Sequence, residues 1–331
     1  MKAYVIESPG DVDALRLQEV PTPSTKPGWV LVQIKAFGLN RTETFIRKGT
    51  VPNIDSYPLI PGIECVGIIE DPSDSHFTKG QKVAALHPGH MGFSYDGSYA
   101  EFTLIPTESI FPVETTLDWA TFAAIPEMFQ VVWGVLNKAL ECQPGQTLLI
   151  RGGTTSIGMT ATRMAKRMNM EVIATTRNPN KVNKLIENGA DHVIIDNGTI
   201  STKIHDLFPH GVDRILEIVG VDTLMDSLQA AKNGYNSETG SIVCMIGLLG
   251  SQSVIPNFSP FMIPHCVKLT SYQGAAMDLD HEKLLEYVKD IEAGKEKINL
   301  DRIFKWSEVP EAHRYMEESK ASGKLVVLMD N

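Results

Sequence analysis

Residues 147–158 read Thr147-Leu148-Leu149-Ile150-Arg151-Gly152-Gly153-Thr154-Thr155-Ser156-Ile157-Gly158. The apolar residues at the start predict a buried strand, and the glycines predict a tight turn. The residues after the glycines predict the beginning of a helix. A dinucleotide-binding turn uses one glycine for the bend, a second for the approach of a pyrophosphate and a third for packing helix on strand. Gly153 and Gly158 fit the first and third roles. Thr155 holds the middle position, where it and Ser156 could offer hydroxyls to phosphate. The predicted cofactor turn is Gly153, Thr154, Thr155, Ser156, Ile157 and Gly158.

Strands and helices alternate on the C-terminal side of this turn, which is the pattern of βαβ units and a parallel sheet. A glycine-rich turn without a ligand remains the structural alternative, but the βαβ context favours a dinucleotide site. We therefore predict a Rossmann-type, doubly wound parallel sheet domain over residues 119–271. The predicted strands are 147–150, 172–175, 193–195, 214–219 and 242–246, and the predicted helices are 157–168 and 181–188.

The rest of the chain predicts a second, mostly β domain. Single hydrophobic cores stop growing near ~250 to 300 residues, so the 331 residues predict two domains. Short β-type runs fill the N-terminal part, and the C-terminal tail is expected to pack back onto it. The fold class is α/β, with one domain formed by residues 1–118 and 272–331. Its predicted strands are 30–37, 65–70, 99–105, 303–306 and 325–329, and its predicted helices are 282–293 and 310–319.

The end of the second strand of the parallel sheet predicts the choice of cofactor. NAD-binding turns carry an acidic residue there for the ribose 2'-hydroxyl, whereas a 2'-phosphate needs basic residues. Here the strand ends in Thr176 and Arg177, with Lys181 following and no carboxylate among them. The three residues suit a phosphomonoester, which predicts NADPH. The alternative is that both cations are ordinary solvated charges.

Composition and charge bear on whether the chain binds nucleic acid, spans a membrane or holds a metal. The net charge of −10 argues against a nucleic-acid surface. No segment approaches the ~18 apolar residues of a membrane span, and the four cysteines are scattered, so a cytoplasmic protein is expected. His87 and His90 lie close together in sequence but lack a convincing third ligand, so no metal site is predicted.

Further motifs carry a family resemblance along nearly the whole chain. They are Asn40-Arg41-Thr42-Glu43-Thr44-Phe45-Ile46-Arg47-Lys48-Gly49, Pro61-Gly62-Ile63-Glu64-Cys65-Val66-Gly67, Asp96-Gly97-Ser98-Tyr99-Ala100-Glu101-Phe102 and Ala321-Ser322-Gly323-Lys324-Leu325-Val326-Val327. With the glycine turn, they resemble the zinc-independent quinone oxidoreductases of the medium-chain dehydrogenase/reductase superfamily. The resemblance implies a GroES-like catalytic domain formed by both chain ends, an active site in a cleft, and a homodimer. It also implies that Asn40 approaches the nicotinamide and that Val219, Ile246, Gly247 and Leu248 line the cofactor groove.

The same resemblance bears on the reaction. Zinc-dependent relatives place Cys and His where this chain has Asn40 and Ile63, neither of which binds zinc. Without zinc, the expected chemistry is hydride transfer from NADPH to a quinone or an α,β-unsaturated carbonyl compound. Asn40 is the candidate hydrogen-bond donor to the developing anion, or alternatively a structural Asn. Glu43 and Arg47, spaced i, i+4, are expected to form a helix salt bridge.

Two other functions stay open at this stage. An enoyl-thioester reductase would use the same hydride chemistry on a longer substrate. A redox sensor or structural protein would bind NADPH with little turnover. A nucleic-acid-binding role is disfavoured by the charge, and the sequence contains no basic cluster with interleaved aromatic residues.

Overall fold

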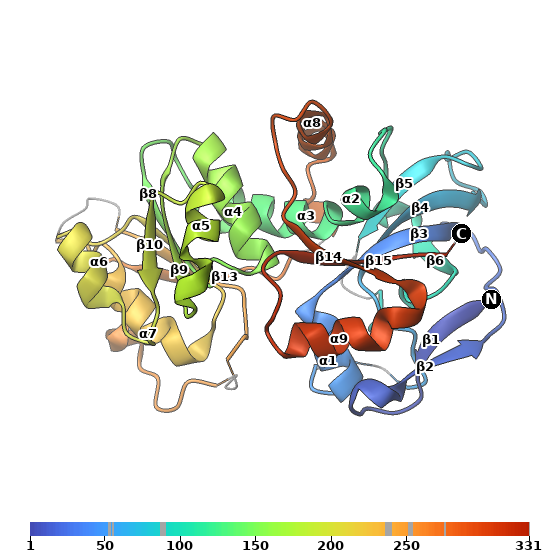
Figure 1. Cartoon of the computed structure of the whole chain (residues 1–331), viewed down its shortest axis with the longest axis horizontal. Coiled ribbons are helices and arrows are strands. Elements are labelled where there is room, and N and C mark those ends of the chain that lie inside the picture. Colours follow the sequence, from blue (N-terminus) through green and yellow to red (C-terminus); the bar gives the residue numbers. More distant parts are fainter. Residues whose placement is uncertain are drawn as a thin grey trace. The chain divides into compact units, whose positions relative to one another are not determined.

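The computed structural model describes residues 1–51, 54, 56–86, 91–235, 240–250, 254–274 and 276–330, and they form two compact units (Figure 1). The terminal unit contains both chain ends, Met1–Gln130 and Ala275–Asn331. The central unit is the continuous segment Val131–Gly274.

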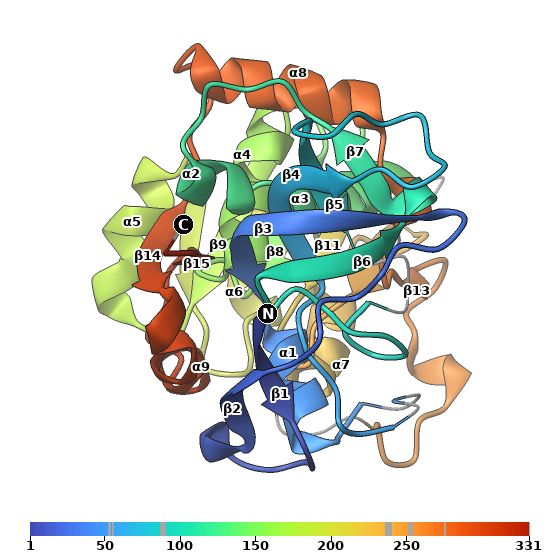
Figure 2. The same cartoon turned by 90° about the vertical axis from the view of Figure 1, so that its right-hand side faces the viewer.

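The terminal unit is built on a seven-stranded sheet in the order β14-β15-β3-β4-β5-β7, with β6 also paired to β3. Residues 30, 32 and 34 of β3 are apolar, buried and two apart, so one face of this strand supplies the core. Figure 2 shows β14 and β15 beside the strands of the N-terminal half. The strands are β1 (Lys2–Ile6), β2 (Leu15–Glu19), β3 (Trp29–Leu39), β4 (Glu64–Asp71), β5 (Lys82–Leu86), β6 (Phe102–Pro106), β7 (Ile110–Pro112), β14 (Leu300–Lys305) and β15 (Lys324–Leu328).

The helices of the terminal unit include two that matter for the polar clusters described below. These are α1 (Arg41–Lys48), which follows β3 directly, and α9 (Val309–Glu317), which contacts it. The others are α2 (Trp119–Ala123), the first part of α3 (Pro126–Gly134) and α8 (His281–Glu292).

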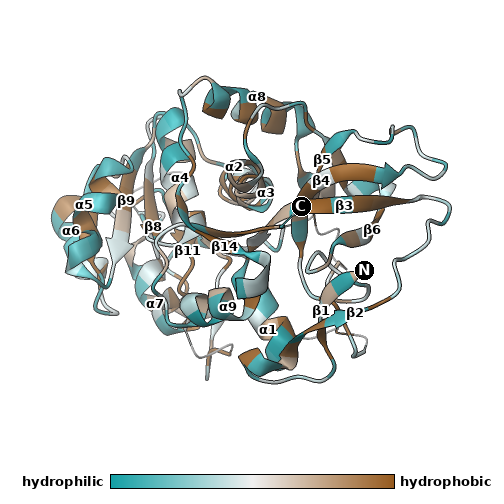
Figure 3. Cartoon of the chain, turned by 45° about the vertical axis from the view of Figure 1, so that its right-hand side comes forward, coloured by the Kyte–Doolittle hydropathy of each residue, from teal (hydrophilic) through white to brown (hydrophobic). Residues whose placement is uncertain are grey.

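The central unit is a six-stranded sheet in the order β10-β9-β8-β11-β12-β13, with every pair parallel. Neighbouring residues of β9 face opposite layers: Ile173 joins the core beneath α6 and α7, whereas Ala174 joins the core beneath α4 and α5. The sheet is therefore covered on both faces, and its strands are among the most apolar segments in Figure 3. Its elements are β8 (Thr147–Arg151), α4 (Ser156–Arg167), β9 (Glu171–Thr176), α5 (Val182–Glu187), β10 (His192–Ile195), α6 (Ser201–Leu207), β11 (Arg214–Glu217), α7 (Val221–Ala230), β12 (Ile242–Met245) and β13 (Lys268–Ser271).

Contrary to the expectation from the sequence, one helical stretch among the described residues has the length and composition of a membrane span. Trp119–Ala139 has a mean hydropathy of 1.2 over its most apolar window, and 78% of that window is buried within the protein. Its last part, Val135–Ala139, is a π-helix. Such burial is typical of a core helix of a soluble protein.

The predicted fold class is confirmed: a parallel, doubly wound α/β sheet accompanies a separate, mostly β sheet. Several strand boundaries differ from the prediction by one to three residues, and contacts in the structure explain two of these differences. The strand expected over 99–105 begins at Phe102, because the Tyr99 and Glu101 backbone N–H groups donate to Pro61 and Lys2. The strand expected over 214–219 ends at Glu217, whose side chain accepts the N–H groups of the next turn.

Candidate cofactor site and a buried polar cluster

The glycine turn lies between β8 and α4, and its bend falls one residue earlier than the sequence suggested. Gly152 has a φ of +96°, in the region that favours glycine. Its N–H donates to Thr175 Oγ1 (3.1 Å), and the N–H of Gly153 donates to the Thr175 carbonyl (3.0 Å). The assignment of the bend to Gly153 is therefore wrong, because the chain must already turn at Gly152 to reach the end of β9.

Gly153 and Gly158 are sites of close approach. A methyl group added at Gly158 would lie 2.6 Å from the Gly152 carbonyl oxygen and 2.8 Å from Gly153 Cα. One added at Gly153 would lie 2.9 Å from Ala174 Cβ. These contacts let α4 pack directly on the turn, which is the role expected of Gly158.

Thr155 caps α4. Its hydroxyl donates to the Gly152 carbonyl (2.9 Å) and accepts the Gly158 N–H (2.9 Å). The hydroxyl is thus occupied in holding the turn, rather than free to donate to a phosphate. The first N–H groups of a helix lack intrahelical acceptors, so Ser156 and Ile157 still offer backbone donors to an anion.

The end of β9 and the turn after it contain the three residues predicted to select the cofactor, Thr176, Arg177 and Lys181. Thr176 is buried, and its hydroxyl accepts the Asn178 N–H (3.1 Å). Lys181 is half-buried at the end of the 3-10 turn Pro179–Lys181. Arg177 is exposed, and no carboxylate in the described part of the chain forms an ion pair with it. Its guanidinium is therefore available to a ligand.

The turns after β11 and β12 pack against each other. The N–H of Gly250 donates to the Val219 carbonyl (2.9 Å), and a methyl group at Gly247 would lie 1.9 Å from the Ile218 carbonyl oxygen. Val219, Ile246 and Gly247 are half-buried and Leu248 is exposed. All the central-unit residues predicted for the cofactor site thus lie at the carboxyl ends of the parallel strands, the edge where open α/β sheets bind ligands.

Asn40 lies in the terminal unit, within a buried polar cluster at the start of α1. Its amide donates to Glu64 Oε1 (2.9 Å) and to Glu43 Oε1 (3.4 Å), while its Oδ1 accepts from Lys324 Nζ (2.7 Å). Lys324 also pairs with Glu64 Oε1 (2.6 Å). Gly38 makes room for this pair, since a methyl group there would lie 2.3 Å from Glu64 Oε1.

Carboxyl groups outnumber cations in this cluster. Burial raises the pKa of Glu43 to about 8, although Lys324 and the Asn40 hydrogen bonds act in the opposite direction. Burial and the neighbouring Glu64 raise the pKa of Glu127, on α3, to about 8 as well. The sequence analysis singled out Asn40 but not Glu64, Glu127 or Lys324 as its neighbours. The only signal for Glu64 and Lys324 in the sequence was that each lies within one of the motifs of the family resemblance.

Arg47 does not form the expected i, i+4 salt bridge with Glu43. It pairs instead with Glu317 of α9 (2.8 Å) and approaches His313 Nδ1 (3.4 Å). The other ring nitrogen of His313 lies 2.9 Å from Tyr99 Oη. Burial and the nearby Arg47 lower the pKa of His313 to about 3, so the imidazole is neutral. The prediction was wrong because Glu43 turns toward the Asn40 and Ile63 N–H groups.

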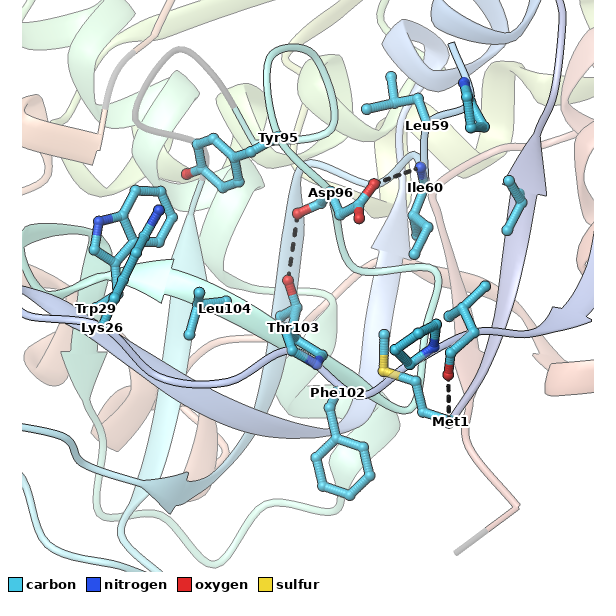
Figure 4. Close-up of a pocket in the computed structure, with 15 residues that line it drawn as sticks. Met1, Lys26, Trp29, Leu59, Ile60, Tyr95, Asp96, Phe102, Thr103 and Leu104 are labelled. Carbon is cyan, nitrogen blue, oxygen red and sulfur yellow. Dashed lines mark hydrogen bonds between the residues drawn. The ribbon is translucent and has the colours of Figure 1, made fainter. Parts of the chain in front are cut away.

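A separate cavity of about 330 Å³ lies in the terminal unit (Figure 4). Lys26 Nζ lies 4.0 Å from the centre of the Trp29 ring, and in another part of the lining Asp96 accepts the Ile60 N–H (3.0 Å). None of the residues predicted for the functional site lines this cavity.

No group of three His, Cys, Asp or Glu residues in the described ranges is arranged to hold a metal ion. His87 and His90 lie outside the described residues.

Two family models match the chain. The alcohol dehydrogenase GroES-like domain matches residues 26–115, and a zinc-binding dehydrogenase domain matches residues 188–327. A probable quinone oxidoreductase from Schizosaccharomyces pombe is 27% identical over 329 residues, which cover 97% of this chain and 94% of that protein.

Solved structures show the same fold. The quinone oxidoreductase of Pseudomonas syringae superposes with a TM-score of 0.86 at 19% identity, with 99% of each chain covered. A mycobacterial protein complexed with NADPH gives a TM-score of 0.86 at 20% identity, again with 99% of each chain covered.

Proposed function

We propose that the chain is a member of the quinone oxidoreductase family of the medium-chain dehydrogenases/reductases, which its similarity to quinone oxidoreductases along nearly its whole length supports, and that it transfers a hydride from NADPH to a quinone or an α,β-unsaturated carbonyl compound. That family and the Rossmann-type central unit indicate an oxidoreductase with a nicotinamide cofactor. The finer proposal concerns the 2'-phosphate of the cofactor and the class of acceptor.

One observation carries the choice of NADPH. The end of β9 offers the exposed, unpaired Arg177 with Lys181 four residues on, and no acidic side chain that would accept a ribose 2'-hydroxyl. A guanidinium binds a phosphomonoester through charge-assisted hydrogen bonds. The mycobacterial structural neighbour complexed with NADPH is in keeping with this reading.

The proposed contributions of the chain are binding and orientation. Backbone N–H groups at the start of α4 would hold the pyrophosphate, and Val219 with Ile246, Gly247 and Leu248 would line the rest of the groove. When bound, the cofactor supplies the hydride. Carbon acceptors activated by conjugation suit this chain, because Asn40 and Ile63 stand at positions where zinc-dependent relatives carry metal ligands.

Asn40 is the proposed hydrogen-bond donor to the oxygen of the acceptor, where negative charge develops. Both of its amide hydrogens have partners, at 2.9 Å in Glu64 and 3.4 Å in Glu43. The longer and weaker of these bonds is the one that a substrate oxygen would replace.

The direct test is oxidation of NADPH, followed at about 340 nm, the band of the reduced nicotinamide. The acceptors are 1,4-benzoquinone, 9,10-phenanthrenequinone, several enones and a crotonyl thioester, and each assay is repeated with NADH. We expect turnover with NADPH and quinones or enones, and little with NADH. Turnover confined to the thioester would instead assign an enoyl-thioester reductase, and tight NADPH binding without turnover would assign a sensor or structural protein.

We further propose a cytoplasmic homodimer. The central unit exposes neighbouring apolar side chains at Phe258, Phe261 and Met262, and that of Phe261 is 98% exposed. A second copy of the chain would remove this surface from water.

A further inference from the structure

Arg151 is a fully buried cation at the end of β8, directly before the cofactor turn. Its guanidinium makes a two-bond contact with Asp196, through Nε to Oδ2 (2.8 Å) and Nη2 to Oδ1 (3.0 Å). Its Nη1 reaches Asp226 (2.8 Å), Ser227 Oγ (3.0 Å) and the Thr223 carbonyl (3.0 Å). One side chain therefore ties β8 to the segment after β10 and to α7 (Figure 1).

The partners of Arg151 extend these contacts to two more turns of the proposed cofactor site. Ser227 passes the network on by donating to Glu217 Oε2 (2.5 Å), whose Oε1 accepts the Val219 and Gly220 N–H groups (2.8 and 3.0 Å). The N–H of Asp196 donates to the Thr176 carbonyl (2.9 Å). The network thus underlies the glycine turn, the end of β9 and the turn after β11.

Charge attraction for phosphate does not explain this arrangement. The single guanidinium faces three carboxyl groups, those of Asp196, Asp226 and Glu217. Burial opposes the ionised forms of Asp196 and Asp226, yet hydrogen bonds from Arg151 and from backbone N–H groups hold both pKa values below the ordinary range. With these two ionised, the cluster carries no positive excess to offer a bound dinucleotide. Its contribution is geometric.

We propose that Arg151 is a positioning residue for the dinucleotide, fixing the relative placement of the three turns before the cofactor binds. The inference rests on the proposed function only in requiring that a nicotinamide dinucleotide binds at this edge. Arg151 holds the turns from beneath and does not touch the cofactor. A preorganised site loses less conformational freedom when a ligand binds. Arg151 would therefore raise the affinity for the cofactor by holding the turns in place beforehand. The glycine turn and the turn after β11 would bind parts that NADPH and NADH share, so affinity for both cofactors is expected to fall when Arg151 is replaced.

The test compares dissociation constants for NADPH and NADH, measured by titration calorimetry at 25 °C, with stability to urea measured separately. Arg151→Lys keeps the charge but loses the two-bond contact, and we expect affinity for both cofactors to fall about tenfold or more, as loss of a charged hydrogen bond predicts. The NADPH-to-NADH ratio should change less than the affinity for either cofactor. A matched control is Lys232→Met, which removes the Lys232–Asp213 pair (2.7 Å) at the opposite ends of the same strands. This control should lose stability without losing affinity.

Arg151→Met leaves the carboxylates of Asp196 and Asp226 without their cation and is expected to fold poorly. The triple variant Arg151→Met, Asp196→Asn, Asp226→Asn removes the unpaired charges and should regain stability while cofactor binding stays weak. Recovery of wild-type affinity in the triple variant, or unchanged affinity in Arg151→Lys, would overturn the positioning role alone. A wild-type protein that binds neither cofactor would overturn the proposed function, and this inference with it.

Discussion

Arg177 and Lys181 are the residues on which the choice of cofactor depends. Replacing both with Ala removes the cations proposed to bind the 2'-phosphate. We expect kcat/KM for NADPH to fall about 10- to 100-fold, since a hydrogen bond to a charged group contributes about 1.5–3 kcal/mol. The value for NADH, which lacks that phosphate, should hardly change. Steady-state kinetics with both cofactors measure the difference.

Lys203→Ala is the matched control for that experiment, because Lys203 is an exposed cation of the same unit that lies on α6 and bonds to the Ile195 carbonyl. It should leave both kinetic constants near wild type. Equal losses for NADPH and NADH in the Arg177 and Lys181 variant would contradict a 2'-phosphate pocket.

Glu43 makes the stability of the terminal unit depend on pH. Its pKa is raised from 4.5 to about 8 in the folded chain. The unfolded chain therefore binds fewer protons between these values, and the free energy of unfolding falls as pH rises from about 4.5 to 8, by up to about 1.4 kcal/mol per pH unit. Glu43→Gln should reduce this dependence and leave the part that is due to Glu127, whose pKa is raised to about 8 as well. Urea unfolding at pH 5, 6.5 and 8 measures it, followed by fluorescence of Trp29, Trp119 and Trp306, which lie in the terminal unit.

Glu114 is an exposed acid of the same unit, so Glu114→Gln should keep the wild-type pH dependence. A Glu43→Gln variant whose stability falls with pH as steeply as that of the wild type would show that Glu43 is ionised in the folded chain.

Among the elements, α4 depends on a single cap. Thr155→Ala removes the hydroxyl that joins the Gly152 carbonyl to the Gly158 N–H. The free energy of unfolding should fall by about 1 kcal/mol, the usual cost of an N-cap, and cofactor affinity should fall too because the turn loosens. Thr155→Ser keeps the hydroxyl and should preserve both. If Thr155→Ala bound NADPH as tightly as wild type, the cap would serve stability alone.

The elements also show what the sequence could reveal. The β8 strand, the glycine turn and α4 were predictable because their signals are local: an apolar run, glycines and a helical pattern lie within about twenty residues. The parallel sheet followed from the βαβ rhythm, whereas its strand order was not predicted. The bend was misplaced by one residue because Gly152 and Gly153 differ only through their contacts with Thr175.

The contacts within the polar clusters could not be predicted from the sequence, because they join residues that are far apart in the chain. Lys324 lies 284 residues from Asn40, and Glu317 lies 270 residues from Arg47. Such pairs depend on the pairing of β15 with β3 and on the packing of α9 against α1. The i, i+4 spacing of Glu43 and Arg47 was a local signal, and the long-range partners outweighed it.

At the scale of the whole molecule, the proposed homodimer predicts a mass in solution twice that of the 36.5-kDa chain. Light scattering coupled to size-exclusion chromatography measures it. Phe261→Glu should shift the protein toward the monomer, because it places a charge on the exposed apolar surface. Tyr235→Glu, which changes another strongly exposed aromatic residue of this unit, shows whether the effect is specific to the 258–262 segment. A wild-type mass of 36.5 kDa would contradict the dimer.

The division of the terminal unit between the two ends of the chain has a consequence for its synthesis. β3 needs β15 as its neighbour, and Asn40 and Glu64 need Lys324, yet the ribosome makes residues 324–328 nearly three hundred residues after β3. The central unit, a continuous segment, has all its strands by then. Until then the β-rich N-terminal part has an unpaired strand edge at β3, and the carboxyl group of Glu64 lacks its cation. A premature stop codon that removed only the last ten residues would leave it in that state permanently, a substrate for chaperones and proteases rather than an enzyme.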